Sequence, residues 1–499
     1  MMQQRTEDTA RAAPSSFAHS SGSAYLVFTG SLPMRRPSSA PRTLLIIALP
    51  LLSRPLIAQS TFAVGSTTVQ VTEMASHLDV PWDMVLGPDG WVWFTQINGV
   101  VSRMNPDDGT LENLYTVADV HETGLGGGLQ SMAFHPDFAN QPYVYLHYMN
   151  SSNTSVVKRF YYDAAQHTFT SASPSLLSLV LHGNASHNGS RIVVDDAGMF
   201  LMSIGDAMSG SAMVQDLSTS YGKILRFDPE GGIPADNPIP GSYVYNWGHR
   251  NPQGLVKASN GRIYNSAHGE GYDDEVNIVE PDRNYGWPTV LGYCNTPAEI
   301  AYCQANDVVE PIHEWSTVVV APSGIDYYAS DAIPEWQNSI LVATLRGKAI
   351  HQLKLNTAGD TVLSDAAFLT DTLGRFRDVL ALPDGRVFIS TSNHDWAGSP
   401  AATDDRILRL EAYDPSSGMH AFDAAPLRLW PNPASGTLHI SGALRSDARI
   451  SIEDPQGRMI MPARSLRDGQ LDVSQLSSGA YLLRVVQQDR PMIARFVVR

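Results

Sequence analysis

One local pattern recurs along most of this chain: a turn rich in proline, aspartate and glycine, an alternating apolar strand, and then a second strand that ends near an acidic turn. Strand pairs bounded by turn residues are typical of antiparallel sheets, and their repetition indicates one structural unit used many times. Six copies can be read from the sequence, at 87–106, 136–162, 195–229, 260–281, 336–355 and 383–411.

The repetition predicts an all-β chain in which residues 60–412 form a six-bladed β-propeller. Few segments show sustained helical periodicity, which agrees with this class. A propeller gathers loops from every blade around one end of its central channel. Residues distant in sequence can therefore meet at that end.

The charge of the chain argues against nucleic acid or anionic lipid as a partner. Its 499 residues include 34 Lys and Arg against 50 Asp and Glu, a net charge of −16. A broad positive surface is therefore not expected, and an anionic ligand must be held by a local cluster of cations.

The N-terminal region carries the pattern of an export signal. Three arginines precede the apolar run 44–52, and a candidate cleavage region follows at 56–59. We expect Met34 to be the initiator and residues 1–59 to be an N-terminal extension with a signal peptide. The apolar run is shorter than the roughly 20 residues of a membrane span, so no transmembrane segment is expected in the mature chain.

The only two cysteines, Cys294 and Cys303, lie in one loop. In an exported chain this spacing favours a local disulfide over two free thiols. A metal site built on the pair is not expected, because no other cysteine supports it.

The composition changes after Glu411. Residues 413–426 are rich in small residues, as in a linker. A new β pattern fills 427–499, and it resembles the C-terminal sorting domain of type IX secretion cargo. The resemblance implies a small β-sandwich, the type IX secretion machinery as a partner, and a secreted or cell-surface location reached through the periplasm.

Four polar clusters exceed what blade geometry needs, and the first joins His187 to Asp206. If the two face each other across strand ends, the carboxylate orients the imidazole and supports its charged form, as a general base requires. A lone histidine in a turn is nevertheless more often structural. The pair is therefore an acid–base hypothesis that depends on the fold.

The second cluster presents His249, Arg250, Asn251 and Gln253 from a backbone fixed by glycine and proline. These donors suit recognition of a planar polar anion. The alternative is a tight inter-blade turn with one solvated arginine.

The third cluster, 268–275, is acidic, and the polar run 284–287 follows it. Carboxylates and backbone carbonyls are hard oxygen ligands, so this cluster favours Ca²⁺ over a transition metal. The alternative is an acidic surface loop. In the fourth cluster, Arg375 and Arg377 share one face of a strand, and adjacent like charges usually hold an anion between them.

Over residues 65–412 the chain resembles soluble PQQ glucose dehydrogenases and aldose (glucose/sorbosone) dehydrogenases. The run 248–255 is the most specific part of this resemblance. The shared segments follow the family order: 80–82, 133–138, 187–206, 248–255, 274–277, 284–288, 321–324 and 375–379.

The resemblance implies three catalytic residues. His187 would take the proton from the anomeric hydroxyl of a sugar while a hydride passes to the PQQ quinone. Asp206 would hold the histidine, and Arg250 would stabilise the negative charge that develops on the quinone oxygen.

The resemblance also implies the cofactor contacts. Arg250, Asn251 and Arg346 would contact PQQ, while Arg375 and Arg377 would pair with its carboxylates.

Two Ca²⁺ sites follow from the same resemblance. Backbone oxygens of Gly269 and Glu270 would bind a Ca²⁺ that also grips PQQ, and Glu275 and Tyr285 would belong to a second, structural site.

Three positions depart from the glucose-dehydrogenase pattern. The family pattern has a cofactor-facing glutamine near the position of Gly126, a proline at the position of Glu270, and a lysine at the position of Arg346. Arg346 keeps the positive charge, whereas Gly126 removes a hydrogen bond and Glu270 changes backbone stiffness beside the metal.

The favoured function is oxidation of an aldose at its anomeric carbon to a lactone, with electrons leaving PQQ for an external acceptor. One alternative is a non-catalytic propeller of the same family that binds a carbohydrate or protein partner. Another is a calcium-dependent lactonase, in which the pair Arg375 and Arg377 has no role.

Overall fold

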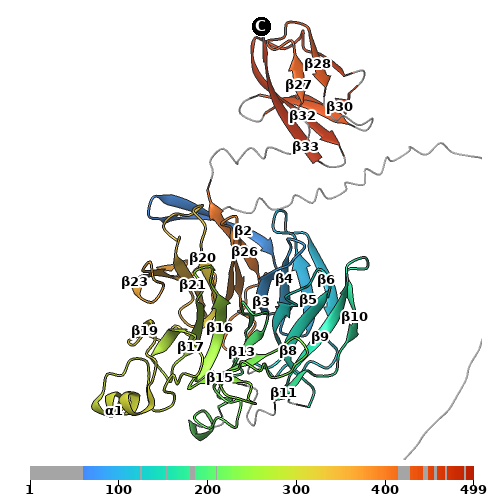
Figure 1. Ribbon diagram of the computed structural model, residues 1–499. Helices are drawn as coiled ribbons and strands as arrows, with labels where there is room; N and C mark the ends of the chain where they lie inside the picture. Colours follow the sequence, from blue (N-terminus) through green and yellow to red (C-terminus); the bar gives the residue numbers. More distant parts are fainter. Residues whose placement is uncertain are drawn as a thin grey trace, which may run out of the picture. The chain divides into compact units, whose positions relative to one another are not determined.

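The computed structural model is almost entirely β (Figure 1). The predicted signal peptide and the predicted linker from residue 414 onward lie outside the described residues. In the part that is described, no helix is long and apolar enough to cross a membrane. The described ranges are 60–123, 126–152, 154–179, 186–208, 211–413, 427–441, 448–454, 458–466, 469–487 and 490–499.

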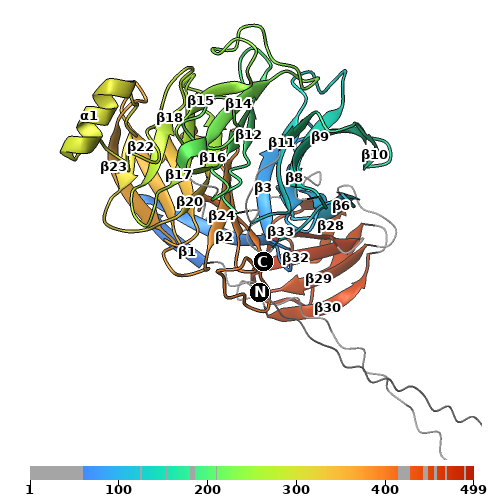
Figure 2. The same ribbon diagram turned by 90° about the horizontal axis from the view of Figure 1, so that it is seen from below.

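Over its first part, the described chain forms six antiparallel sheets of four or more strands. Their innermost strands, β3, β7, β12, β16, β20 and β24, contact one another in a closed ring, and Figure 2 shows the five that it labels, β3, β12, β16, β20 and β24, around one centre. Each of the six sequence copies supplies the second and third strands of one sheet. The predicted all-β propeller is therefore confirmed.

The first three sheets follow the chain in order. Their strands are β3 (Pro81–Leu86), β4 (Val92–Gln96), β5 (Val100–Met104) and β6 (Leu111–Thr116); β7 (Leu129–Phe134), β8 (Tyr143–Met149), β9 (Ser155–Asp163), β10 (Thr168–Ala172) and β11 (Leu177–Leu179); and β12 (Ile192–Val194), β13 (Phe200–Ile204), β14 (Lys223–Phe227) and β15 (Val244–Trp247). A short 3₁₀ helix spans Ser211–Met213.

The next three sheets complete the ring. Their strands are β16 (Asn251–Lys257), β17 (Ile263–His268), β18 (Asp274–Ile278) and β19 (His313–Trp315); β20 (Pro322–Tyr328), β21 (Ser339–Thr344), β22 (Ile350–Leu355) and β23 (Val362–Phe368); and β24 (Phe376–Ala381), β25 (Val387–Thr391), β26 (Ile407–Ala412), β2 (Thr67–Ala75) and β1 (Ser60–Val64).

The second strand of a sheet is covered on both faces by its neighbours. Strands β4, β13, β21 and β25 are buried at every residue, whereas the outer strand β6 is largely exposed. A strand buried on both faces gains from a continuous apolar sequence. This explains the apolar runs from which the repeats were read.

The ring closes with strands from the beginning and the end of the propeller sequence. Strands β1 and β2 pair onto β26, so the sixth sheet has five strands among the described residues. Glu335 of the neighbouring sheet holds the turn between β1 and β2, because its Oε1 accepts from Ser66 N at 2.8 Å and its Oε2 accepts from Thr67 Oγ1 at 2.8 Å. The six repeats did not include these closing strands.

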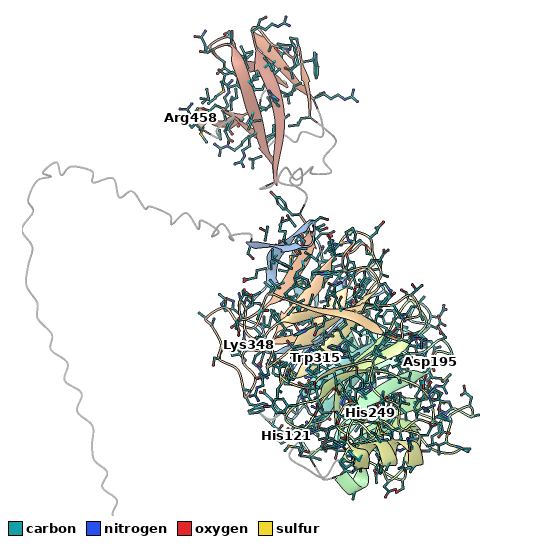
Figure 3. All side chains as sticks on the ribbon, turned by 90° about the vertical axis from the view of Figure 1, so that its left-hand side faces the viewer. His121, Asp195, His249, Trp315, Lys348 and Arg458 are labelled. Atoms are coloured by element: carbon teal, nitrogen blue, oxygen red, sulfur yellow. A yellow bond between two sulfur atoms is a disulfide. The ribbon has the colours of Figure 1, made fainter. Side chains whose placement is uncertain are left out.

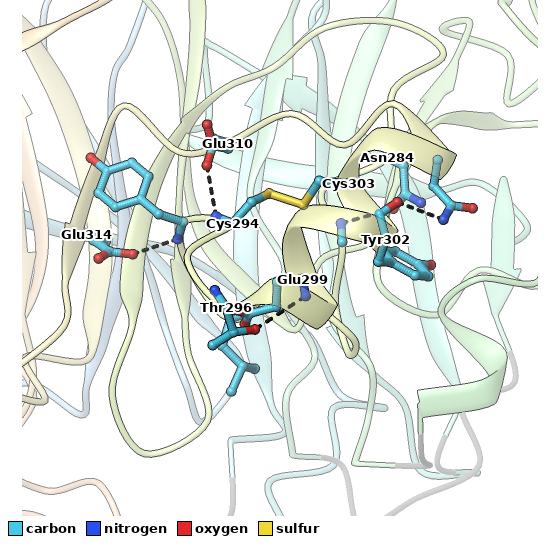
Figure 4. The surroundings of a disulfide bond; sticks show 12 residues. Asn284, Cys294, Thr296, Glu299, Tyr302, Cys303, Glu310 and Glu314 are labelled. Atoms are coloured by element: carbon cyan, nitrogen blue, oxygen red, sulfur yellow. Dashed lines mark hydrogen bonds between the residues drawn. A yellow bond between two sulfur atoms is a disulfide. The ribbon is translucent and has the colours of Figure 1, made fainter.

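The predicted disulfide between Cys294 and Cys303 is confirmed (Figure 4). It fastens a helix that was not predicted, α1 (Pro297–Asn306), to the loop before it. Thr296 and Glu299 form a reciprocal capping box at the start of this helix. Thr-Pro-Ala-Glu is a recognisable N-terminal signature, so the sequence did contain a signal for α1.

The C-terminal part forms two sheets over one apolar core, which confirms the predicted β-sandwich. Leu438, Ile450 and Phe496 are buried in this core. The two sheets consist of β27 (Arg428–Trp430), β28 (Thr437–Ser441) and β31 (Gln470–Asp472); and of β30 (Met459–Ser465), β29 (Arg449–Glu453), β32 (Gly479–Gln487) and β33 (Arg490–Val498).

Candidate active site

A cavity of about 650 Å³ lies in the propeller where the innermost strands begin. Its wall also includes loops that follow the second strands, such as 394–397 after β25. Of the predicted catalytic and cofactor residues, six line this cavity: His187, Arg250, Asn251, Arg346, Arg375 and Arg377. The topology thus brings together residues that are almost 200 positions apart.

Irregular pairing aims several side chains into the cavity. The register shifts near the start of five innermost strands, and in four of them the residue skipped in the pairing lines the cavity. An extra residue in one strand redirects its side chain out of the regular alternation. The four skipped residues are Trp82, Gln130, Gln253 and Arg377.

The predicted pair of His187 and Asp206 is present. His187 Nδ1 lies 2.8 Å from Asp206 Oδ1, and the Asp206 side chain is nearly buried behind the imidazole. Asp206 Oδ1 also accepts from Met208 N at 2.9 Å. Gly205 permits this approach, because a Cβ at that position would lie 1.9 Å from the His187 carbonyl oxygen.

The adjacent residues Arg250 and Asn251 connect the same region. The Arg250 carbonyl accepts from Asp206 N at 2.7 Å, and Asn251 Oδ1 accepts from Gly189 N at 3.2 Å. The Arg250 guanidinium lies 5.4 Å from the ring centroid of Trp287, and burial lowers its pKa. Two segments of the predicted site are therefore joined by one backbone hydrogen bond and one hydrogen bond from backbone to side chain.

His249 does not reach the cavity, so its assignment as a ligand donor was wrong. His249, labelled among the propeller side chains in Figure 3, is fully buried; its Nε2 is 3.0 Å from Asn246 Oδ1 and its ring stacks on Tyr285 at 4.4 Å. Burial lowers the pKa of His249 to about 3, so the ring is neutral at physiological pH. The alternation that turns Arg250 toward the cavity turns His249 into the core.

The arginine pair holds an anion, as predicted, but one that belongs to the protein. Asp395 Oδ2 accepts from Arg375 Nη2 at 2.8 Å and from Arg377 Nη2 at 3.2 Å. Burial lowers the pKa of Arg377 to about 10. The cavity wall still has a positive balance, because its four arginines face three acidic residues, Glu122, Asp274 and Asp395.

Of the predicted calcium residues, only Gly269 lines the cavity. Asp274 holds this loop, since its Oδ1 accepts from Gly269 N at 3.0 Å and its Oδ2 accepts from Ala321 N at 2.7 Å. Glu270 is exposed beside it. In the described part of the chain, no cluster of three His, Cys, Asp or Glu side chains could hold a metal ion.

The side chains of the two residues predicted for the second calcium site, Glu275 and Tyr285, have different partners. Glu275 pairs with Glu314 across β18 and β19, and desolvation together with nearby carboxylates raises the pKa of Glu275 to about 8. The Tyr285 phenol is engaged elsewhere, because it donates to Ile278 O at 2.5 Å and accepts from Glu280 N at 2.9 Å. Only the Tyr285 backbone is therefore open to a metal role.

The lining residues that the sequence interpretation missed include Gln130, Asp395 and Trp396. Gln130 is a polar residue near the start of β7, and Asp395 and Trp396 follow β25. The sequence signal was a polar residue at a strand end. Such a residue lines the cavity only if that strand end lies at the cavity end of the propeller, which the sequence does not show.

Residues 78–397 match the family model described as glucose/sorbosone dehydrogenase. The chain belongs to the glucose/sorbosone dehydrogenase family. Residues 428–499 match the model of the secretion system C-terminal sorting domain. The predicted families and the predicted enzyme class, an oxidoreductase acting on sugars, are confirmed.

Individual relatives agree with this membership. Quinoprotein glucose dehydrogenase B of Acinetobacter calcoaceticus is 28% identical, over 62% of this chain and 83% of the relative. Aldose sugar dehydrogenase YliI of Escherichia coli is 30% identical, over 68% of this chain and 94% of the relative. The structure of the PQQ-bound aldose sugar dehydrogenase of Streptomyces coelicolor superposes with a TM-score of 0.60 at 30% identity, covering 69% of this chain and 98% of that one.

Proposed function

We propose that this sugar dehydrogenase oxidises an aldose at its anomeric carbon to a lactone, uses PQQ with Ca²⁺ as its cofactors, and passes electrons to an external acceptor. The observation that carries the proposal is the convergence of the His187–Asp206 pair and four arginines on one cavity. A base and a cluster of cations in one water-accessible pocket suit proton removal next to an anionic cofactor.

The cavity wall fits a planar cofactor with several carboxylates. Arg346, Arg375 and Arg377 line it together, and Asp395 neutralises only part of their charge. Arginine forks match carboxylates in charge and geometry. In a chain of net charge −16, this local positive balance favours an anionic ligand.

PQQ would supply the hydride acceptor when bound. His187 Nδ1 donates to Asp206, which leaves Nε2 to accept the proton of the anomeric hydroxyl. Asp206 then stabilises the imidazolium. The Arg250 guanidinium stabilises negative charge that develops beside it, and its stacking on Trp287 fixes its position without neutralising it.

The donor chemistry also fits Ca²⁺. The Gly269 loop, held by Asp274, supplies hard backbone oxygens at the cavity wall. Glu275 and Glu314 lie opposite each other, and two facing carboxylates are unfavourable unless a proton or a cation joins them. A structural Ca²⁺ at this pair is therefore proposed, with Tyr285 contributing through its backbone.

We also propose that the mature protein is exported through the periplasm by the type IX secretion machinery. The sorting domain at 428–499 supports this route. The proposed boundaries are a propeller at 60–412, a linker at 413–426 and the sorting domain at 427–499.

The catalytic proposal is tested by His187→Ala. A general base contributes about 10²- to 10⁴-fold, so we expect the rate of cofactor reduction in stopped flow to fall within that range. The dissociation constants of PQQ and sugar should change little, because the base acts in the transition state. Asp206→Asn should lower the same rate less, since the imidazole itself remains.

A matched control is His351→Ala. His351 also contacts an aspartate, with Nδ1 2.7 Å from Asp365 Oδ1, but it does not line the cavity. Its replacement should leave the reduction rate unchanged. Reduction by His187→Ala at the wild-type rate would instead favour a propeller that binds its ligand without this catalytic base.

A further inference from the structure

Gln130 is a buried amide in the cavity wall with an incomplete set of hydrogen bonds. It is one of the four cavity-lining residues skipped in the strand pairing, and it is 3% exposed. Its Nε2 donates to the Gly126 carbonyl at 2.9 Å, which fixes the orientation of the amide. Its Oε1 is buried and has no partner among the described residues. A buried acceptor in this state requires a donor.

Gln253, the equivalent residue of another innermost strand, shows what a satisfied amide looks like here. Its Oε1 accepts from Arg377 Nη1 at 3.0 Å and from Ser323 Oγ at 3.1 Å. The Gln253 amide oxygen is therefore already hydrogen-bonded to protein side chains. Gln130 Oε1 lacks such partners, although both side chains line the same cavity.

The surroundings of Gln130 indicate which ligand would donate a hydrogen bond to its Oε1. The Gly126 carbonyl that accepts from Gln130 also accepts from Asn188 Nδ2 at 3.0 Å, and Asn188 follows His187 in the chain. The amide is thus fastened to the segment that carries the proposed base. A sugar held there presents several hydroxyl donors near its reacting carbon, whereas carboxylates and quinone oxygens only accept.

We propose that Gln130 is a specificity-determining residue whose Oε1 accepts a hydrogen bond from an aldose hydroxyl other than the one that is oxidised. The inference rests on the proposed function, because it assigns a substrate contact to the same cavity. The chain lacks an amide side chain at Gly126 and has one at Gln130, near the start of β7.

The test compares the wild type with Gln130→Met, which keeps the length of the side chain but lacks the amide. The best aldose substrate and its deoxy analogues, each lacking one non-anomeric hydroxyl, are assayed with the PQQ- and Ca²⁺-loaded enzyme. Loss of one neutral hydrogen bond should raise KM about 3- to 10-fold, with kcat nearly unchanged. For one analogue, the KM penalty seen in wild type should disappear in the variant.

Two further measurements make the result specific. PQQ affinity, measured by fluorescence titration, should equal that of wild type, and this equality also shows that the variant is folded. Gln70→Met is the matched control, since Gln70 is a buried glutamine of β2 outside the cavity. If Gln130→Met does not fold, Gln130→Asn withdraws the amide from the ligand and should give the same pattern.

Deoxy-sugar penalties that are identical in wild type and variant would overturn the inference. Weaker PQQ binding with unchanged penalties would also overturn it, by assigning the amide to the cofactor. A wild-type enzyme that oxidises no aldose would instead refute the proposed function, and this inference with it.

Discussion

At the residue scale, the cavity is built from side chains whose neighbours leave them few alternatives. Asp206 holds His187 at 2.8 Å, and Asp395 lies within 3.2 Å of both Arg375 and Arg377. Such pairs set the direction of each side chain before a ligand enters, which lowers the ordering cost of binding. Asp395 also compensates the charge of the buried Arg377 and of the partly exposed Arg375 in the ligand-free protein.

Arg377→Ala tests the cofactor assignment at this scale. The substitution removes a charge-assisted partner of a PQQ carboxylate, which is worth about 1.5–3 kcal/mol, or about a 10- to 150-fold weaker complex. The measurement is a PQQ titration by fluorescence, with and without a calcium chelator.

Arg386→Ala is its control, because Arg386 forms an ion pair with Asp107 and neither residue lines the cavity. The control should bind PQQ as wild type does. If Arg377→Ala also bound PQQ with wild-type affinity, the arginine pair would have only a structural role.

At the element scale, the sequence predicted the second and third strands of each sheet and missed most of the others. The second strands are buried on both faces and therefore have long apolar runs. The innermost strands contain register shifts that disturb alternation, and β2 pairs with a strand more than 300 residues away. Local patterns cannot report such pairings, since the partner is chosen by the closed ring.

The limits of local sequence patterns also explain which residues of the site were predicted and which were missed. Motif spacing predicted the pair His187 and Asp206, because only one hairpin separates them. It did not predict that Asp395 contacts the arginines or that Gln130 enters the cavity, because both depend on local irregularities of the strands. His249 and Arg250 are adjacent in sequence, and only the structure shows which of the two faces the cavity.

The closing strands give a pH-dependent prediction. Hydrogen bonds from Thr67 and the Ser66 backbone lower the pKa of Glu335 to about 2, from an ordinary value of 4.5. Its contribution to stability is therefore complete above pH 4.5 and is lost as the pH falls toward 2. We expect Glu335→Gln to melt at a lower temperature than wild type at pH 6, and the difference to vanish near pH 2.

The measurement is a set of calorimetric scans of both proteins across this pH range. A difference in melting temperature that stays constant down to pH 2 would show that the ionised carboxylate does not hold the turn.

At the scale of the whole molecule, the chain joins a catalytic propeller to a separate sorting domain with its own apolar core. Deletion of residues 427–499 should therefore leave the melting temperature of the propeller and its PQQ binding unchanged. In the native host, the truncated protein should remain inside the cell, whereas full-length protein should reach the surface or the medium.

Cell fractionation with immunoblotting measures the location, and calorimetry measures the fold. Truncated protein that is insoluble because the propeller unfolds would show that the boundary is wrong. Truncated protein that is exported as efficiently as full-length protein would remove the sorting role.

The central claim is that one cavity binds PQQ and lets a sugar reduce it. The most direct measurement is to load the purified wild-type protein with PQQ and Ca²⁺, mix it anaerobically with a panel of aldoses, and follow the absorbance of the bound quinone. We predict Ca²⁺-dependent binding of PQQ and its rapid reduction by at least one aldose, with the corresponding lactone as product. Tight PQQ binding with no reduction by any aldose, or no PQQ binding in the presence of Ca²⁺, would contradict the account.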